Sequence, residues 1–207
     1  DRTSRGLGDV YKRQILASLE KFIFPRNKLF NFFSKKKVDP SCFYLYGNVG
    51  VGKTMIANFV YDQINIKKTK FHFNEFMINF HDFRHQKKDD NTISEFGKKI
   101  KSKYDFIYLD EFQITNIVDA MILGKLFENI FLKKIKILIT TNTKLIDLYK
   151  DGLQREQFTP FIDLIKKKSI QKELFLEDYR TQSQDHNQRI FYPCNEKTLF
   201  KINQKFR

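Results

Sequence analysis

Short apolar runs alternate with longer stretches of helical spacing through most of the chain. The longer stretches predict helices at 53–64, 76–83, 93–100 and 117–131. The short runs predict strands at 42–46, around Phe71 and Phe73, at 106–109, at 135–140 and at 174–176. Strands that are apolar on both faces and alternate with helices are typical of an α/β domain with a mostly parallel, buried sheet.

The helix expected at 53–64 has a one-sided apolar pattern. Its residues are Met55, Ile56, Phe59, Val60 and Ile64.

Four segments differ in character. Residues 1–14 combine Arg and Gly in a manner unlike the rest and resemble translated sequencing-adapter sequence, so we set them aside as a non-native leader. Residues 15–40 predict a helical segment followed by a polar loop. We assign 41–180 to the main domain and 181–207 to the start of a truncated C-terminal region.

The overall composition is that of a folded protein. Of 207 residues, 41% are hydrophobic and 30% are charged, which argues against intrinsic disorder. No apolar run approaches the roughly 18 residues of a membrane-spanning helix. Cys42 and Cys194 lie far apart and offer no metal-site spacing, which suits a reducing compartment. We expect a bacterial cytosol, with the mitochondrial matrix as the alternative.

Positive charge is in excess. The chain has 38 Lys and Arg against 24 Asp and Glu, a formal charge of +14. Lysine clusters at 35–37, 67–70, 133–136 and 166–168 stand at the ends of expected elements rather than along one helical stripe. We predict solvated surface, and a polyanion-binding face is the alternative.

A phosphate-binding loop follows the first expected strand. Residues 47–54 match the pattern G-x-x-x-x-G-K-[ST], between a strand and a helix. Glycines let successive N–H groups turn toward phosphate oxygens, and the helix N-terminus adds positive potential. We expect Lys53 to reach the β and γ phosphates of ATP and Thr54 to bind Mg²⁺. The expected nucleotide contacts are Gly47, Asn48, Val49, Gly50, Val51, Gly52, Lys53 and Thr54.

Two adjacent acids end the strand at 106–109. Asp110 is suited to assist Mg²⁺, and Glu111 is placed to orient and deprotonate an attacking water. An acid directly after the magnesium aspartate favours hydrolysis of ATP over passive binding.

Two further polar residues are candidates with competing interpretations. Asn142 follows the strand at 135–140 and is placed to hydrogen-bond the γ-phosphate or the water, although Thr-Asn is also common turn chemistry. Arg155 is suited to stabilise charge on the phosphoryl group in a neighbouring subunit, or to form a surface salt bridge with Glu156 or Asp151.

Several longer stretches resemble the AAA+ family that contains the bacterial cell-division ATPase ZapE and its mitochondrial relatives. The most specific are 110–124 and 148–162; the others are 71–77 with His81, and 178–180. The resemblance implies a P-loop AAA+ core of the ASCE class, Asn142 as a sensor and Arg155 as an arginine finger.

The same resemblance implies a homo-oligomeric ring that acts on the tubulin-like division protein. A helicase-loader-like, nucleic-acid-binding module and a noncatalytic docking switch are the alternatives. The chain departs from the family where Asn74 replaces a usual histidine and Asn116 a usual aspartate. We expect His72 and His81 to be packing residues with hydrogen bonds. Because the chain stops before most of the helical lid, we expect it to be incomplete at both ends.

Overall fold

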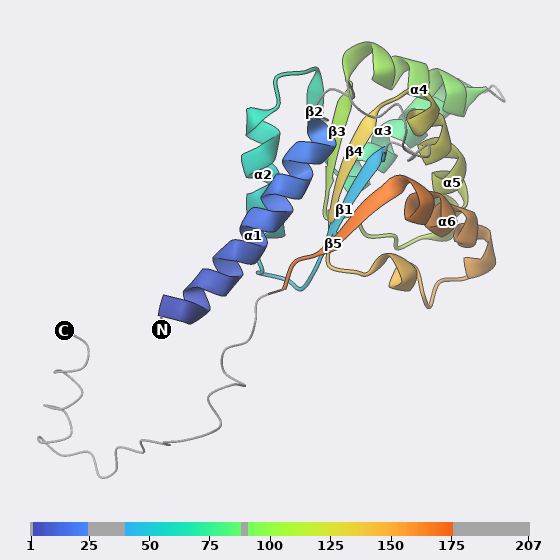
Figure 1. The fold of residues 1–207 in the computed structure, drawn as a ribbon. Helices are drawn as coiled ribbons and strands as arrows, with labels where there is room; N and C mark the ends of the chain where they lie inside the picture. Colours follow the sequence, from blue (N-terminus) through green and yellow to red (C-terminus); the bar gives the residue numbers. More distant parts are fainter. Residues whose placement is uncertain (1, 25–39, 88–90, 176–207) are drawn as a thin grey trace, which may run out of the picture. The chain divides into compact units, whose positions relative to one another are not determined.

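Five strands form one sheet with helices on both faces (Figure 1). The computed structural model describes residues 2–24, 40–87 and 91–175. The strands are β1 Cys42–Tyr46, β2 Lys68–His72, β3 Phe106–Asp110, β4 Lys136–Thr141 and β5 Ser169–Glu173. The helices are α1 Arg2–Ile23, α2 Lys53–Gln63, α3 Phe73–Gln86, α4 Thr92–Lys103, α5 Ile117–Leu132 and α6 Thr159–Lys168, with short 3₁₀ turns η1 Leu145–Asp147 and η2 Arg155–Phe158.

The strand order positions the polar ends of three strands beside one another. The order is β2-β3-β4-β1-β5, and every pairing is parallel. Strand β4 therefore lies between β1, which leads into the phosphate-binding loop, and β3, which ends in Asp110. The predicted α/β class with a parallel sheet is confirmed.

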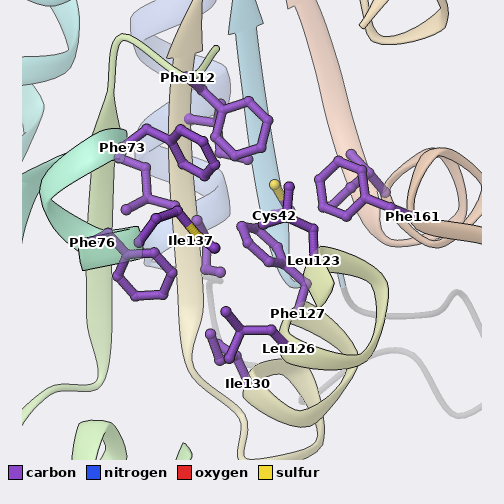
Figure 2. Packing of buried hydrophobic residues seen from close by; sticks show 14 of the residues in the cluster. Cys42, Phe73, Phe76, Phe112, Leu123, Leu126, Phe127, Ile130, Ile137 and Phe161 are labelled. Atoms are coloured by element: carbon purple, nitrogen blue, oxygen red, sulfur yellow. The ribbon is translucent and has the colours of Figure 1, made fainter. Parts of the chain in front are cut away.

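Two hydrophobic clusters hold the helices onto the sheet. One packs α3 to α6 against one face and contains many aromatic side chains; Figure 2 shows among them Phe73 of α3, Phe127 of α5 and Phe112, which follows β3. The other packs α1 and α2 on the opposite face and contains Ile15, Leu19 and other buried residues. Burial of such aromatic side chains contributes about 1.5–3 kcal/mol each, so these clusters dominate the stability of the domain.

The fifth strand and the buried side of α2 differ from the pattern seen in the sequence. The fifth strand lies at 169–173, whereas the sequence predicted it at 174–176. It is a half-buried strand at the edge of the sheet and is rich in polar residues. Such a strand has no continuous apolar run from which it can be predicted. In α2 the buried residues include Ile56 and Val60, whereas Met55 and Phe59 are 62% and 54% exposed.

The lysine run at 67–70 is also not simple solvated surface. Lys68 and Lys70 lay their ammonium groups 4.5 and 4.8 Å from the ring centroids of Tyr61 and Tyr108. Long lysine stems cover apolar surface in this way while the charged end finds polar partners.

The N-terminal helix includes residues that the sequence analysis set aside. Helix α1 begins at Arg2, and its predicted apolar positions from residue 15 onward pack in the second cluster. Residues 25–39 of the expected segment 15–40, the stretch 178–180 and the expected C-terminal region 181–207 lie outside the described residues. No helix in the described part of the chain has the length and apolar character needed to span a membrane.

Asn116 begins α5 by capping it. Its side-chain oxygen accepts from the backbone N–H of Asp119 at 2.8 Å, and its amide donates to the Asp119 carboxylate at 2.6 Å. The same carboxylate lies 2.7 Å from Nε2 of His81 on α3. Asn116, which stands where the family usually has an aspartate, is thus part of a set of hydrogen bonds that joins α3 to α5. The prediction that His81 packs with a hydrogen bond agrees with this contact.

We expect Asn116→Ala to lower the free energy of unfolding by about 1 kcal/mol, because α5 loses its cap. Urea denaturation measures this loss. Asn116→Ser keeps a capping oxygen without adding charge beside Asp119 and is the control. Equal stability of the alanine variant and the unaltered protein would show that the cap contributes nothing.

Candidate active site

A cavity of about 290 Å³ lies at the carboxyl ends of β3 and β4, beside the loop that follows β1. It gathers residues from three separate segments of the chain, 49–55, 110–111 and 140–142. Its lining is Val49, Gly50, Gly52, Lys53, Thr54, Met55, Asp110, Glu111, Thr140, Thr141 and Asn142.

Glycines shape the loop for two distinct reasons. Gly52 is the N-cap of α2 with φ of 95°, a left-handed conformation that side chains disfavour. At Gly47 an added Cβ would lie 1.9 Å from the carbonyl oxygen of Leu174, so no other residue fits without moving the backbone. The loop therefore delivers the N-terminus of α2, with its unpaired N–H groups, to the cavity.

Lys53 closes the loop on itself. Its ammonium donates to the carbonyl oxygens of Gly47 at 2.7 Å and Asn48 at 2.6 Å. Burial lowers the pKa of Lys53, partly offset by the negative charge of Asp110, so the net pKa lies below its ordinary value. The cation lines the cavity and is held there by the loop that it stabilises.

Asp110 is a buried carboxylate with donors on both oxygens. Oδ1 accepts from the hydroxyls of Thr54, at 3.3 Å, and Thr140, and from the N–H of Glu111 at 3.1 Å. Oδ2 lies 3.2 Å from Nζ of Lys70. Burial raises the pKa of Asp110, but the hydrogen bonds from Thr140 and Lys70 and the lysine charge outweigh it, so the pKa lies below its usual value. The side chain is accordingly held as an anion.

The environment of Glu111 differs from that of Asp110. Glu111 has φ of 54°, a left-handed conformation that costs a non-glycine residue about 1–2 kcal/mol. The side chain is 78% exposed while it lines the cavity, and Oε2 lies 3.5 Å from Nδ1 of His72. The two acids thus have different environments: one is fixed among donors, and the other is open to solvent.

The remaining predicted residues divide into two groups. Asn142 lines the cavity together with Glu111, as the sheet order requires. Arg155 is not among the lining residues; it begins η2 and donates to the carbonyl of Ile146. Among the ion pairs of the described residues, none joins Arg155 to Glu156 or Asp151, so the alternative of a local salt bridge is wrong.

Sequence reasoning missed some residues of the site. Thr140 and Thr141 line the cavity, and Met55 does so from α2. Lys70 contacts Asp110 from β2. The threonines were detectable as polar residues that end an apolar strand, whereas nothing in a run of lysines distinguishes Lys70.

The oxygen donors suit a magnesium ion. The hydroxyl of Thr54 and the carboxylate of Asp110 are hard ligands 3.3 Å apart. Within the described residues no group of three or more His, Cys, Asp or Glu forms a metal cage. Magnesium is commonly bound by one or two protein oxygens plus phosphate and water, so the small donor set fits this ion.

Comparison with known proteins decides the family. The sequence profile of the AFG1-like ATPases matches residues 9–207. The chain belongs to the AFG1-like ATPase family. This confirms the resemblance drawn from the sequence. The chain is 35% identical over 178 residues to lactation elevated protein 1 homolog B of Danio rerio. The matched region covers 79% of this chain and 35% of that protein.

Similarity extends to a bacterial relative and to more distant structures. This AFG1-like chain is 34% identical over 125 residues to cell division protein ZapE of Escherichia coli K12, covering 59% of the chain and 33% of ZapE. It therefore spans about a third of the length of these relatives. The structure of AMPPCP-bound DnaA from Aquifex aeolicus shares the fold at 17% sequence identity, with a TM-score of 0.56. The matched region covers 95% of this chain and 51% of the DnaA chain.

Proposed function

We propose that this AFG1-like chain binds ATP with Mg²⁺ in the cavity and hydrolyses the β–γ phosphoanhydride. One observation carries the proposal: Lys53, Thr54, Asp110, Glu111 and Asn142 converge on one cavity from separate segments. A cation, two magnesium ligands, an accessible carboxylate and an amide are the groups that hydrolysis of a triphosphate requires.

Each group has a distinct part in the reaction. The loop N–H groups and Lys53 bind the phosphates, and Thr54 with Asp110 would hold Mg²⁺, which when bound neutralises charge on the β and γ oxygens. Glu111 takes a proton from the attacking water as that water bonds to the γ-phosphorus and the bond to the β–γ bridging oxygen breaks. Asn142 donates to the γ-phosphate or orients the water.

A ring of identical subunits completes this proposal. Arg155 does not line its own cavity, so we assign it to the cavity of a neighbour, where it stabilises charge on the transferred phosphoryl group. The relationship to cell division protein ZapE supports a role in cell division. Action on the tubulin-like division protein in a bacterial cytosol is part of the same proposal.

Lys53→Ala tests nucleotide binding. We expect the dissociation constant for the non-hydrolysable analogue AMPPCP with Mg²⁺ to rise about 10- to 100-fold, because charge-assisted hydrogen bonds to phosphate and the bonds that close the loop are lost together. Isothermal titration calorimetry measures the change.

Lys98→Ala removes the same charge from an exposed position on α4 and serves as control. It should bind as the unaltered protein does. If both variants weaken binding equally, net charge rather than the loop attracts the nucleotide. If the unaltered protein gives no saturable heat, the proposed function is wrong.

A further inference from the structure

Lys70 connects the two elements that carry the proposed magnesium ligands. Its ammonium lies 3.2 Å from Oδ2 of Asp110 on β3 and donates to Oδ1 of Asn58 on α2 at 2.9 Å. Asn58 stands one helical turn beyond Thr54, and the Thr54 hydroxyl donates to the other oxygen of Asp110. These contacts close a ring of side chains between α2 and β3.

The sheet fixes the path of this lysine. Lys70 pairs with Tyr108 in the parallel register of β2 and β3, and its ammonium lies 4.8 Å from the Tyr108 ring centroid. The Lys70 side chain is 31% exposed, and that of Asp110 is 5% exposed. An ammonium held by an aromatic face, an amide oxygen and a buried carboxylate has little freedom to move.

We infer that Lys70 is a positioning residue, which sets the spacing of Thr54 and Asp110 for Mg²⁺ and thereby the dependence of nucleotide binding on that ion. This inference rests on the proposed function. Lys70 does not line the cavity, so it acts through Asp110 and α2 rather than by touching the nucleotide. With Oδ2 engaged by Lys70, Oδ1 faces the Thr54 hydroxyl.

Lys68 supplies a matched comparison within the same strand. It lies two residues before Lys70, on the same face of the sheet, and also fastens β2 to α2. Its ammonium donates to the carbonyl of Tyr61 at 2.6 Å and lies over the Tyr61 ring. Within the described residues, its ammonium contacts Tyr61 and Asp62 of α2 and not Asp110. A change at Lys68 therefore removes a similar clamp away from the magnesium ligands.

The experiment measures how strongly Mg²⁺ promotes nucleotide binding. Calorimetry gives the dissociation constant of AMPPCP in EDTA and in MgCl₂, and their ratio is the magnesium effect. We expect Lys70→Met to reduce this ratio about 10-fold or more, with the constant in EDTA unchanged, because loss of a neighbour that orients a metal ligand typically weakens metal binding by about 10- to 100-fold. Lys70→Arg, which keeps charge and donors, should recover most of the ratio, and Lys68→Met should retain it.

The outcomes separate the inference from competing explanations. An unchanged or increased ratio in Lys70→Met overturns it, because then the lysine is irrelevant to the metal or opposes it by charge repulsion. An equal loss of affinity in EDTA and MgCl₂ also overturns it and assigns Lys70 a purely structural role. If the unaltered protein binds AMPPCP equally in both solutions, the magnesium part of the proposed function fails instead.

A second variant covers the case in which Lys70→Met does not fold. Asn58→Ala leaves the pair of Lys70 and Asp110 but releases it from α2. The variant loses the hydrogen bond between Lys70 and Asn58. Because such a bond contributes about 1 kcal/mol, we expect the magnesium effect to decrease about fivefold. If Asn58→Ala keeps the full ratio, the ring of contacts does not set the ligand spacing.

Discussion

Arg155→Ala is expected to lower ATP hydrolysis by about 10³- to 10⁵-fold, the effect of removing an arginine that stabilises the transferred phosphoryl group. The binding of AMPPCP should change little, because Arg155 does not line the cavity of its own chain. Steady-state hydrolysis and calorimetry on the same preparations separate the two effects. Arg84→Ala, at an exposed position on α3, is the control for loss of one arginine.

Mixing two inactive variants tests whether this arginine acts between subunits. An Arg155→Ala subunit keeps an intact cavity, and a Glu111→Gln subunit keeps its arginine. In a mixed ring the second subunit supplies Arg155 to the first, so activity should return on mixing. A mixture that stays inactive while its subunits still associate would falsify the assignment of Arg155 to a neighbour.

Glu111→Gln is expected to lower the turnover number by about 10²- to 10⁴-fold and to leave the dissociation constant for ATP with Mg²⁺ nearly unchanged. The amide keeps the size of the carboxylate but cannot accept the proton of the attacking water. Lys53 and Asp110, the residues that would hold the phosphates and the metal, are unchanged. Single-turnover hydrolysis and nucleotide trapping measure the two quantities.

Glu128→Gln, on an exposed position of α5, removes the same charge away from the cavity and should hydrolyse ATP normally. Ordinary hydrolysis by Glu111→Gln removes that residue from the catalytic role. The dependence of rate on protein concentration addresses the docking-switch alternative. A ring enzyme gains activity per subunit as it assembles, whereas a passive switch stays slow at every concentration.

The phosphate loop and the acid pair show why part of the site was accessible from the sequence. Residues 47–54 are contiguous, so their spacing alone specifies a loop and a helix start. Asp110 and Glu111 follow an apolar run whose length marks a strand. In each case the chemistry depends on residues that are neighbours along the chain, and local pattern is then sufficient.

The position of Asn142 needed one further step. Asn142 lines the same cavity as Glu111 because β3 and β4 are neighbours in the sheet, so the ends of these two strands meet. The position of β5 at 169–173, before the predicted run at 174–176, and the exposure of Met55 were not predictable in the same way. An edge strand has few buried residues, and apolar residues at helical spacing do not by themselves reveal how wide the buried side is.

The amino-acid sequence by itself determined the fold class, the phosphate loop, the two acids and the family, because each is expressed in residues close together along the chain. Only the tertiary structure decided which lysine belongs to the site. Lys70 resembles its neighbours in a basic run, and it reaches Asp110 because parallel pairing aligns β2 with β3. Contacts between residues 40 positions apart depend on strand order and register, which local spacing does not encode.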